Sequence, residues 1–325
     1  MCSLSDMPDI PMNLILDYVG FPSILSLQKV SSHFRNYIIE KKPDLKLQKI
    51  FIELDYDRIE ITWISNSERF EICYEYKENG YNVESSYGEK VLGYCNYIDA
   101  FFKDFKLIMS HQKSVLEWFG VNLKHTVDAQ SLAQFPKTFE ETLKTNPVNT
   151  KKLGLGFFNG DEMKLILSCL NANYLKEVVL FTNSDVEEVC LNDVVGLEQW
   201  KNLKRLNTIF LPISSISIRE FTHFTSMDVE FNSICAEDLN VLRQAAVDSS
   251  NFEMFRIECH EFNDDQRLAE LFGIPLRSEN GNADLWYFNT CRPGKVLEID
   301  HSPHFKFNFH LIEVGSVPNG AEIRS

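Results

Sequence analysis

Cysteine is the first residue type in this chain that could carry chemistry, as a metal ligand, a redox centre or a nucleophile. The eight cysteines are Cys2, Cys73, Cys95, Cys169, Cys190, Cys235, Cys259 and Cys291. No two of them form a Cys-x-x-Cys pair, so neither a zinc ribbon nor a thioredoxin-like motif is predicted. A chain of 325 residues can bury a core without disulfide crosslinks. We therefore expect reduced thiols and a cytoplasmic or nuclear location.

Histidine offers a second candidate, a metal site in the stretch Asp300-His301-Ser302-Pro303-His304, with His310 nearby. On a strand followed by a turn, the two rings of His-x-x-His point to different sides. Pro303 also breaks any helical spacing, and no second pair of ligands follows. The sequence therefore predicts no metal and no cofactor.

Glycine-rich spacing between Gly154 and Gly160 suggests a phosphate-binding loop. The segment matches neither Gly-x-Gly-x-x-Gly nor the P-loop. Asp161 and Glu162 begin the next helix, and they would repel a phosphate at its N-terminus. We interpret the segment as a strand edge and a turn, with an α/β enzyme that uses this turn as the alternative.

Adjacent carboxylates occur at Asp264-Asp265 and Glu140-Glu141, which suit a helix start and a solvated helix face better than an acid–base pair. The chain shows no Gly-x-Ser-x-Gly elbow and no Cys-His signature, so no catalytic residue is predicted. Its net charge of −15 argues against nucleic acid or an anionic membrane as the partner. We expect neither a signal peptide nor a transmembrane helix.

The elements that must position these residues begin with an apolar helical stretch between Met7 and Arg35. Two helical faces are apolar, with Pro22 suited to the first turn of the second helix. About thirty residues cannot build an adequate core alone. This apolar stretch therefore needs a neighbour, within the chain or in a partner.

The spacing of this stretch resembles the F-box, the helical motif that joins substrate receptors to the adaptor of SCF-type ubiquitin ligases. Met7, Pro11, Ser31 and Phe34 depart from the family pattern, which otherwise runs without a gap. The resemblance implies an adaptor-binding set made of Pro8, Ile15, Leu16, Val19, Ile24, Leu25, Leu27, Val30 and Phe34. The alternative is an ordinary amphipathic helical hairpin.

The hydrophobic period then changes from helical to two. Alternation from Lys49 to Tyr87 predicts a four-stranded β-meander, and a helix follows from Tyr97. Beyond it, strands centred near Leu155, Val179, Thr208, Val229 and Phe255 alternate with helices. The spacing favours an irregular leucine-rich-repeat-like α/β solenoid over a doubly wound sheet.

Three further strands near the C-terminus are predicted to cap this stack, before a flexible tail. The helix between the fourth and fifth strands is expected to begin after Ser233 as its N-cap. The predicted class is α+β, with a three-helix F-box at residues 4–45, a connecting meander at 46–95, an α/β stack at 96–315 and the tail at 316–325.

A second resemblance lies in the segment from Val194 to Lys204, which contains Leu-x-Gln-Trp-Lys at Leu197 to Lys201. It is similar to the signature of the FTH domain, found after an F-box in a large nematode-expanded receptor family. Trp200, spaced with Leu197 and Leu203 on one helix, suits a core position, with contact to a partner as the alternative.

The two resemblances together imply a non-catalytic substrate-recognition subunit of an SCF-type cullin–RING ubiquitin ligase. Its partners would be the SCF adaptor, the cullin through that adaptor, and a protein substrate held by the FTH domain. The substrate and the residues that bind it are not indicated by the sequence. The alternative is an adaptor-bound scaffold that recruits partners without causing their degradation.

Overall fold

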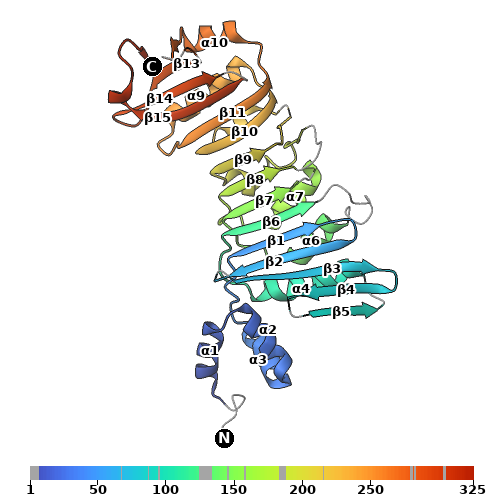
Figure 1. The fold of residues 1–325 in the computed structure, drawn as a ribbon. Coiled ribbons are helices and arrows are strands. Elements are labelled where there is room, and N and C mark those ends of the chain that lie inside the picture. The colour runs from blue at the N-terminus through green and yellow to red at the C-terminus, as the bar shows by residue number, and fades with distance from the viewer. Residues whose placement is uncertain are drawn as a thin grey trace. The chain divides into compact units, whose positions relative to one another are not determined.

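The computed structural model describes residues 7–66, 68–86, 88–93, 96–123, 134–144, 146–156, 159–182, 188–214, 216–278, 281, 283–302 and 305–325. The chain divides into two compact units, Met1–Gly156 with Leu165–Leu175 and Phe157–Lys164 with Lys176–Ser325. Helices come first and sheets follow, so the predicted α+β class is confirmed (Figure 1).

Three short helices open the first unit: α1 (Asp9–Tyr18), α2 (Phe21–Val30) and α3 (Ser32–Lys41). Proline lies in the first turn of α2, where its missing N–H leaves no hydrogen bond unmade. Ser31 ends α2 and begins α3, because its hydroxyl accepts a hydrogen bond of 3.2 Å from the backbone N–H of Phe34. The left-handed backbone of Lys42, with φ of 45°, then ends α3.

An antiparallel meander follows, made of β1 (Lys49–Leu54), β2 (Arg58–Ser65), β3 (Glu68–Lys77), β4 (Gly80–Ser85) and β5 (Gly88–Gly93). The prediction of four strands missed β5, whose short polar sequence shows no alternation and whose pairing with β4 alone defines it. Gly80 is required at the β3–β4 turn, since its φ is +144° and an added Cβ would lie 2.1 Å from the carbonyl oxygen of Leu92.

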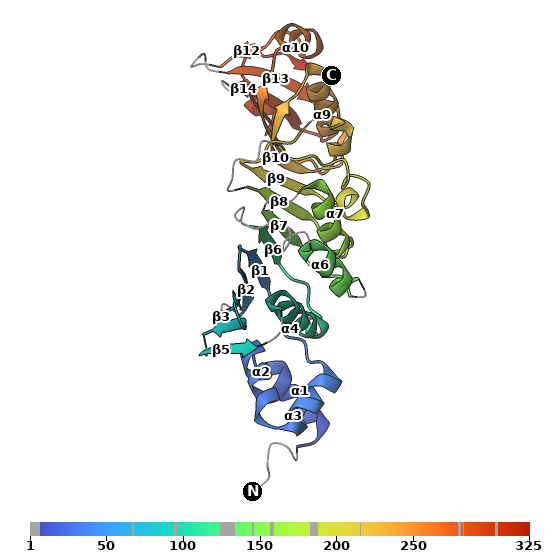
Figure 2. The ribbon, with the colours of Figure 1, turned by 90° about the vertical axis from the view of Figure 1, so that its right-hand side faces the viewer.

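Two parallel strands extend the sheet of the first unit on the other side of β1. These are β6 (Trp118–Leu123), which the sequence analysis did not predict, and β7 (Lys152–Gly156). The helices α4 (Tyr97–His111) and α6 (Phe135–Leu143) lie on one side of the strands β1, β2 and β6 in Figure 2. Alternate residues of β1 and β2 are buried, as the period of two predicts.

Aromatic rings fill the space between this sheet and its helices. The Phe105 ring lies with its centroid 5.5 Å from that of Phe101, 5.9 Å from that of Phe139 and 6.1 Å from that of Trp63. All four side chains are fully buried. Aromatic packing therefore supplies much of the core of the first unit.

The second unit begins with four parallel strands in chain order: β8 (Glu177–Phe181), β9 (Arg205–Ile209), β10 (Ser226–Ser233) and β11 (Met254–Glu261). All five predicted strand centres fall within β7 to β11. The connections carry α8 (Glu198–Lys201), the 3-10 turn η2 (Ile218–Phe221) and α9 (Ala236–Asp248), and α7 (Gly160–Ser168) follows β7.

After α10 (Asp265–Phe272) the pairing becomes antiparallel. The strand β15 (Lys306–Glu313) pairs with β11, and then come β14 (Lys295–Ser302), β13 (Asp284–Asn289) and β12 (Leu276–Arg277). The three predicted C-terminal strands correspond to β13, β14 and β15. Among the described residues, no helix is both long and apolar enough to cross a membrane.

Two local predictions are corrected. The N-cap of α9 is Cys235 rather than Ser233, because the Asp238 carboxylate reaches back to the backbone N–H of Cys235. The predicted flexible tail, residues 316–325, instead begins at the end of η3 (Val314–Ser316) and contains β16 (Ile323–Arg324), which pairs with β13. The Arg324 guanidinium anchors it with a hydrogen bond of 2.7 Å to the carbonyl oxygen of Ile274, a contact between distant residues that composition does not indicate.

Phe105→Ala is expected to lower the free energy of unfolding by about 3–5 kcal/mol, because it leaves a cavity among three aromatic rings. Denaturant unfolding followed by circular dichroism measures this loss. Leu107→Ala on the same helix is the matched control, since that side chain is 45% exposed. The control should change stability by less than about 0.5 kcal/mol. Equal losses for the two variants would contradict this account of the core.

Candidate functional site

The helices α1 to α3 are tied together by polar contacts at one end. The Tyr37 hydroxyl of α3 donates a hydrogen bond of 2.8 Å to the Asn13 side-chain oxygen of α1 and lies 3.1 Å from the Asp9 carbonyl oxygen. The Lys41 ammonium lies 3.0 Å from the Asp9 carboxylate. These contacts place α1 against α3 in a defined orientation.

Some residues of the predicted adaptor-binding set are buried within the first unit. Leu16, Ile24 and Phe34 are buried, at 2%, 1% and 5% exposure. Phe21, which the sequence analysis did not single out, is also buried, and its ring packs on Trp63 and Phe70 of the meander, with centroids 5.9 Å and 6.0 Å apart. These residues hold the helices together and against the sheet of the first unit.

The remainder of the predicted set reaches the surface. Pro8 and Val30 are exposed, and the half-buried members are Ile15, Val19, Leu25 and Leu27. The F-box spacing therefore mixes two kinds of position, one that stabilises the helices and one that is available to a partner.

A row of exposed apolar side chains on α1 was missed from the sequence. Ile10, Leu14 and Tyr18 are 76%, 55% and 89% exposed. They are four residues apart and share one face of the helix, opposite the buried Met12 and Leu16. We call Ile10, Leu14 and Tyr18 the α1 stripe. The period of four was readable from the sequence, but only the packing shows that this side of α1 is the one facing solvent.

The FTH-like signature forms a buried cluster in the second unit. The Trp200 side chain is 1% exposed, its indole N–H donates to the Glu220 carbonyl oxygen at 3.3 Å, and its ring meets Phe221 and Phe224 edge-on. The prediction that Trp200 is a core residue is confirmed. Leu197 and Leu203 flank the helix α8 rather than lying within it, because α8 is a single turn.

The glycine-rich segment after Lys152 has a packing role. Gly154 lies on β7 beneath the Trp118 ring of β6, and an added Cβ there would lie 2.9 Å from the indole nitrogen. The Lys152 ammonium lies over the same ring, 4.3 Å from its centroid. Gly154 therefore accommodates a tryptophan on the sheet. Phe157 and Phe158 lie outside the described residues.

His301 and His310, two of the histidines considered as metal ligands, lie on opposite faces of the sheet. The His310 imidazole of β15 lies 2.7 Å from the Glu298 carboxylate of β14, and that hydrogen bond raises the His310 pKa. His301 instead stacks on Phe307, with centroids 4.3 Å apart, and burial lowers its pKa. His304 lies outside the described residues. No group of three His, Cys, Asp or Glu side chains in the described part of the chain converges on a metal position.

The remaining candidates have structural partners. The Asp264 carboxylate accepts a hydrogen bond of 3.0 Å from the backbone N–H of Ala236 and so caps the start of α9, while Asp265 begins α10. Glu140 and Glu141 lie on α6, as predicted for charges on a helix. The described cysteines Cys73, Cys169, Cys190, Cys235, Cys259 and Cys291 are free. Cys2 and Cys95 lie outside the described residues.

Two protein families match this chain: the F-box domain over residues 4–46 and the FTH domain over residues 133–275. The chain is also 26% identical over 295 residues to F-box A protein 224 of Caenorhabditis elegans, an alignment that covers 88% of this chain and 74% of that protein. No solved structure matches the chain significantly.

The helices at the N-terminus and the sheets that follow them, matched by these two domains in this order, define an F-box protein. The chain belongs to the F-box proteins that carry an FTH domain, as its similarity to F-box A protein 224 also indicates.

The pair of His310 and Glu298 predicts a pH dependence of stability. The His310 pKa lies above its ordinary value of 6.5. The stability that this histidine contributes is therefore complete below pH 6.5 and is lost as the pH rises through its folded-state pKa. The hydrogen bond from His310 lowers the Glu298 pKa below 4.5, so its contribution is lost as the pH falls through that lowered value. The pair should therefore stabilise the fold most between about pH 4.5 and 6.5.

His310→Gln should lower Tm between about pH 4.5 and 6.5 and should flatten the dependence of Tm on pH above and below this window, as measured by thermal melts at a series of pH values. His33→Gln is the control, because that exposed histidine lies on α3 of the first unit, whereas the pair belongs to the second unit. Identical pH profiles for wild type and His310→Gln would contradict the assignment.

Proposed function

We propose that this chain is the substrate-recognition subunit of an SCF-type cullin–RING ubiquitin ligase. It binds the adaptor through α1 to α3, and through that adaptor the cullin, and it holds a protein substrate through the FTH domain. The observation that carries this proposal is the α1 stripe, three large apolar side chains in one row on a matched F-box, all more than half exposed. Contiguous exposed apolar side chains of this kind mark interaction sites.

The packing of the helices supports a division of roles within the F-box. Leu16, Ile24 and Phe34 maintain the helices from inside, as their burial requires. The half-buried and exposed members of the predicted set, together with the α1 stripe, form the adaptor surface. Burying one such exposed side chain contributes about 1.5–3 kcal/mol, and several together offset the freedom that the two proteins lose on association.

The strand order supports the proposed solenoid. In the second unit β8, β9, β10 and β11 follow one another in chain order, each parallel to the last. A doubly wound sheet instead reverses its strand order at a switch point. We therefore propose an irregular leucine-rich-repeat-like stack, with β12 to β15 as its C-terminal cap.

The proposed mechanism is non-catalytic. The receptor holds a substrate lysine near the ubiquitin carrier of the ligase, and the rate enhancement arises from effective concentration. The FTH domain is proposed to extend over residues 96–315, because α4 packs on α6 and β15 pairs with β11, and both α6 and β11 lie within the matched region.

Leu14→Asp and Tyr18→Asp should each weaken binding to the SCF adaptor at least about tenfold, because each places an unpaired charge in an apolar interface. Affinity is measured with purified full-length protein and adaptor by calorimetry, with Tm recorded for each variant. Ile274→Asp is the matched control: that side chain is 84% exposed and lies in the second unit. Unchanged affinity in both α1 variants would contradict the proposed surface.

Leu16→Asp separates the two roles of the F-box. It should weaken adaptor binding and also lower Tm, because the charge enters a position that is 2% exposed. Leu14→Asp should leave Tm near the wild-type value. The half-life of a bound partner, with and without the receptor, then separates a ligase receptor from a scaffold that does not cause degradation.

A further inference from the structure

The segment between α3 and β1 connects the F-box helices to the sheet of the first unit. It runs from Lys42 to Gln48 as irregular backbone. Two of its residues, Lys42 and Lys46, have left-handed backbone with φ of 45° and 52°. This conformation is uncommon for residues other than glycine and costs free energy. The contacts around the segment must therefore hold it in place.

The Asp44 carboxylate is the centre of these contacts. It accepts hydrogen bonds from the backbone N–H groups of Lys46 at 3.2 Å, Lys113 at 2.9 Å and Ser114 at 3.2 Å. The Ser114 hydroxyl donates a further hydrogen bond to the second carboxylate oxygen. Lys113 and Ser114 follow α4, which ends at His111. One carboxylate therefore ties the segment after α3 to the segment after α4.

These hydrogen bonds also determine the charge of Asp44. Burial acts to raise its pKa, but the hydrogen bonds from Ser114, Lys113 and Lys46 together outweigh burial and hold the pKa below its ordinary value. The carboxylate is therefore ionised at physiological pH. Hydrogen bonds to an ionised acceptor are about twice as strong as those between neutral groups.

A second side chain, Gln112, holds the same segment three residues further along. Its amide oxygen accepts a hydrogen bond of 3.1 Å from the Leu47 N–H, and its amide nitrogen donates one of 3.1 Å to the Leu47 carbonyl oxygen. The same nitrogen donates to the Ser114 carbonyl oxygen at 2.8 Å. Gln112 thus takes the place of a neighbouring strand beside Leu47, whose own side chain is buried.

The segment also contacts α1 and β2. The Lys46 ammonium donates a hydrogen bond of 2.7 Å to the carbonyl oxygen of Asp17, in the last turn of α1. The Ser65 hydroxyl at the end of β2 donates one of 3.3 Å to the Lys46 carbonyl oxygen. The F-box helices are therefore held both here and through the Phe21 ring of α2. We call residues 42–48 together with residues 112–114 the joint.

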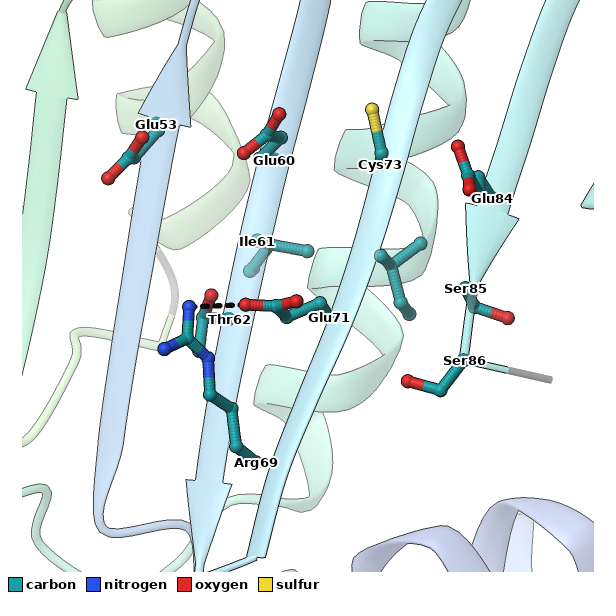
Figure 3. A pocket seen from close by; sticks show the side chains of 11 residues that line it. Glu53, Glu60, Ile61, Thr62, Arg69, Glu71, Cys73, Glu84, Ser85 and Ser86 are labelled. Atoms are coloured by element: carbon teal, nitrogen blue, oxygen red, sulfur yellow. Dashed lines mark ion pairs between the residues drawn. The ribbon is translucent and has the colours of Figure 1, made fainter. Parts of the chain in front are cut away.

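The joint differs from an exposed ion pair of the same unit. In the hollow on β2 and β3, Arg69 pairs with Glu71 (Figure 3), and the two side chains are 67% and 57% exposed. A pair of this kind contributes little, because water and salt screen both charges. Asp44 is half-buried, and three of its four donors are backbone N–H groups whose positions the chain fixes. The joint therefore defines one geometry.

We propose that Asp44 and Gln112 are positioning residues that fix the orientation of the F-box helices relative to the sheet of the first unit. Apolar packing such as that of Phe21 is non-directional, whereas hydrogen bonds are directional and select one angle. This inference rests on the proposed function. With the adaptor bound to α1 to α3, the joint limits where a bound substrate lysine lies, and its effective concentration near the ubiquitin carrier depends on that limit.

Pulsed electron paramagnetic resonance on the full-length protein measures this orientation. Spin labels are attached at Asn36 of α3 and Glu78 of the β3–β4 turn, both exposed, through an azide-bearing amino acid that leaves the cysteines unlabelled. Wild type should give one narrow distance distribution. Asp44→Ala and Gln112→Ala should each broaden this distribution, because the F-box helices then move about their remaining apolar contact.

Amide hydrogen exchange tests whether the joint opens as a unit. The Leu47 N–H is bonded to Gln112, which Asp44→Ala leaves unchanged. Loss of the Asp44 carboxylate should nevertheless speed exchange at Leu47 about tenfold or more, since hydrogen bonds to charged groups are among the stronger ones.

Asn96→Ala is the matched control. The Asn96 side chain accepts a hydrogen bond of 2.9 Å from the Ile98 N–H at the start of α4, so this variant removes a side-chain hydrogen bond from the same helix but outside the joint. Its distance distribution and its exchange at Leu47 should match those of wild type. Equal broadening in the control would overturn the proposal, and so would unchanged distributions in both joint variants.

Adaptor affinity should be unchanged in Asp44→Ala, because the joint lies outside the α1 stripe and the predicted adaptor-binding set. In the assembled ligase, Asp44→Ala should receive ubiquitin on more of its own lysines than wild type, as mapped by mass spectrometry. The same lysines in both proteins would overturn the positioning role. Failure of wild type to bind the adaptor, with the distance distributions as expected, would instead refute the proposed function and leave the joint supported.

Discussion

The rest of the structure depends on one constraint, the need to cover the apolar face of a strongly alternating sheet. In the first unit α4 and α6 satisfy it with phenylalanine side chains such as Phe105 and Phe139, which pack on Trp63 and Phe119. Because successive side chains alternate, covering one face commits the other to solvent. The glutamates of β1 to β5 are therefore displayed by the same pattern that builds the core.

The F-box helices must also cover their apolar side chains. Ten-residue helices bury too little surface to fold alone, so Phe21 of α2 packs on Trp63 and Phe70 of the meander. The opposite side of α1 then remains outside this packing, with Leu14 and Tyr18 exposed. Within the F-box, α2 therefore anchors the helices on the meander, and α1 displays apolar side chains to solvent.

Much of the fold was predictable because its signals are local and periodic. The strands β7 to β11 and the helices α4, α9 and α10 follow from alternation and helical spacing. Three features escaped prediction. The strand β5 has a short polar sequence without alternation. The strand β6 and the docked end at Arg324 are defined by contacts with residues distant in the sequence. The cap of α9 differs from the prediction for a local reason, since the carboxylate that selects Cys235 as N-cap belongs to Asp238 in the first turn of the helix.

The sequence by itself determined the family, the α+β class and the identity of the F-box residues, because these reside in residue types and short spacings. Tertiary structure alone decided which of those residues are available to a partner. Leu16 and Leu14 are both leucines on α1, yet one is 2% exposed and the other 55%. The register of β1 to β5 likewise decided that Glu53, Glu60 and Glu84 form one row. A spacing repeats along one chain, whereas exposure and register depend on which neighbour the rest of the chain brings to each face.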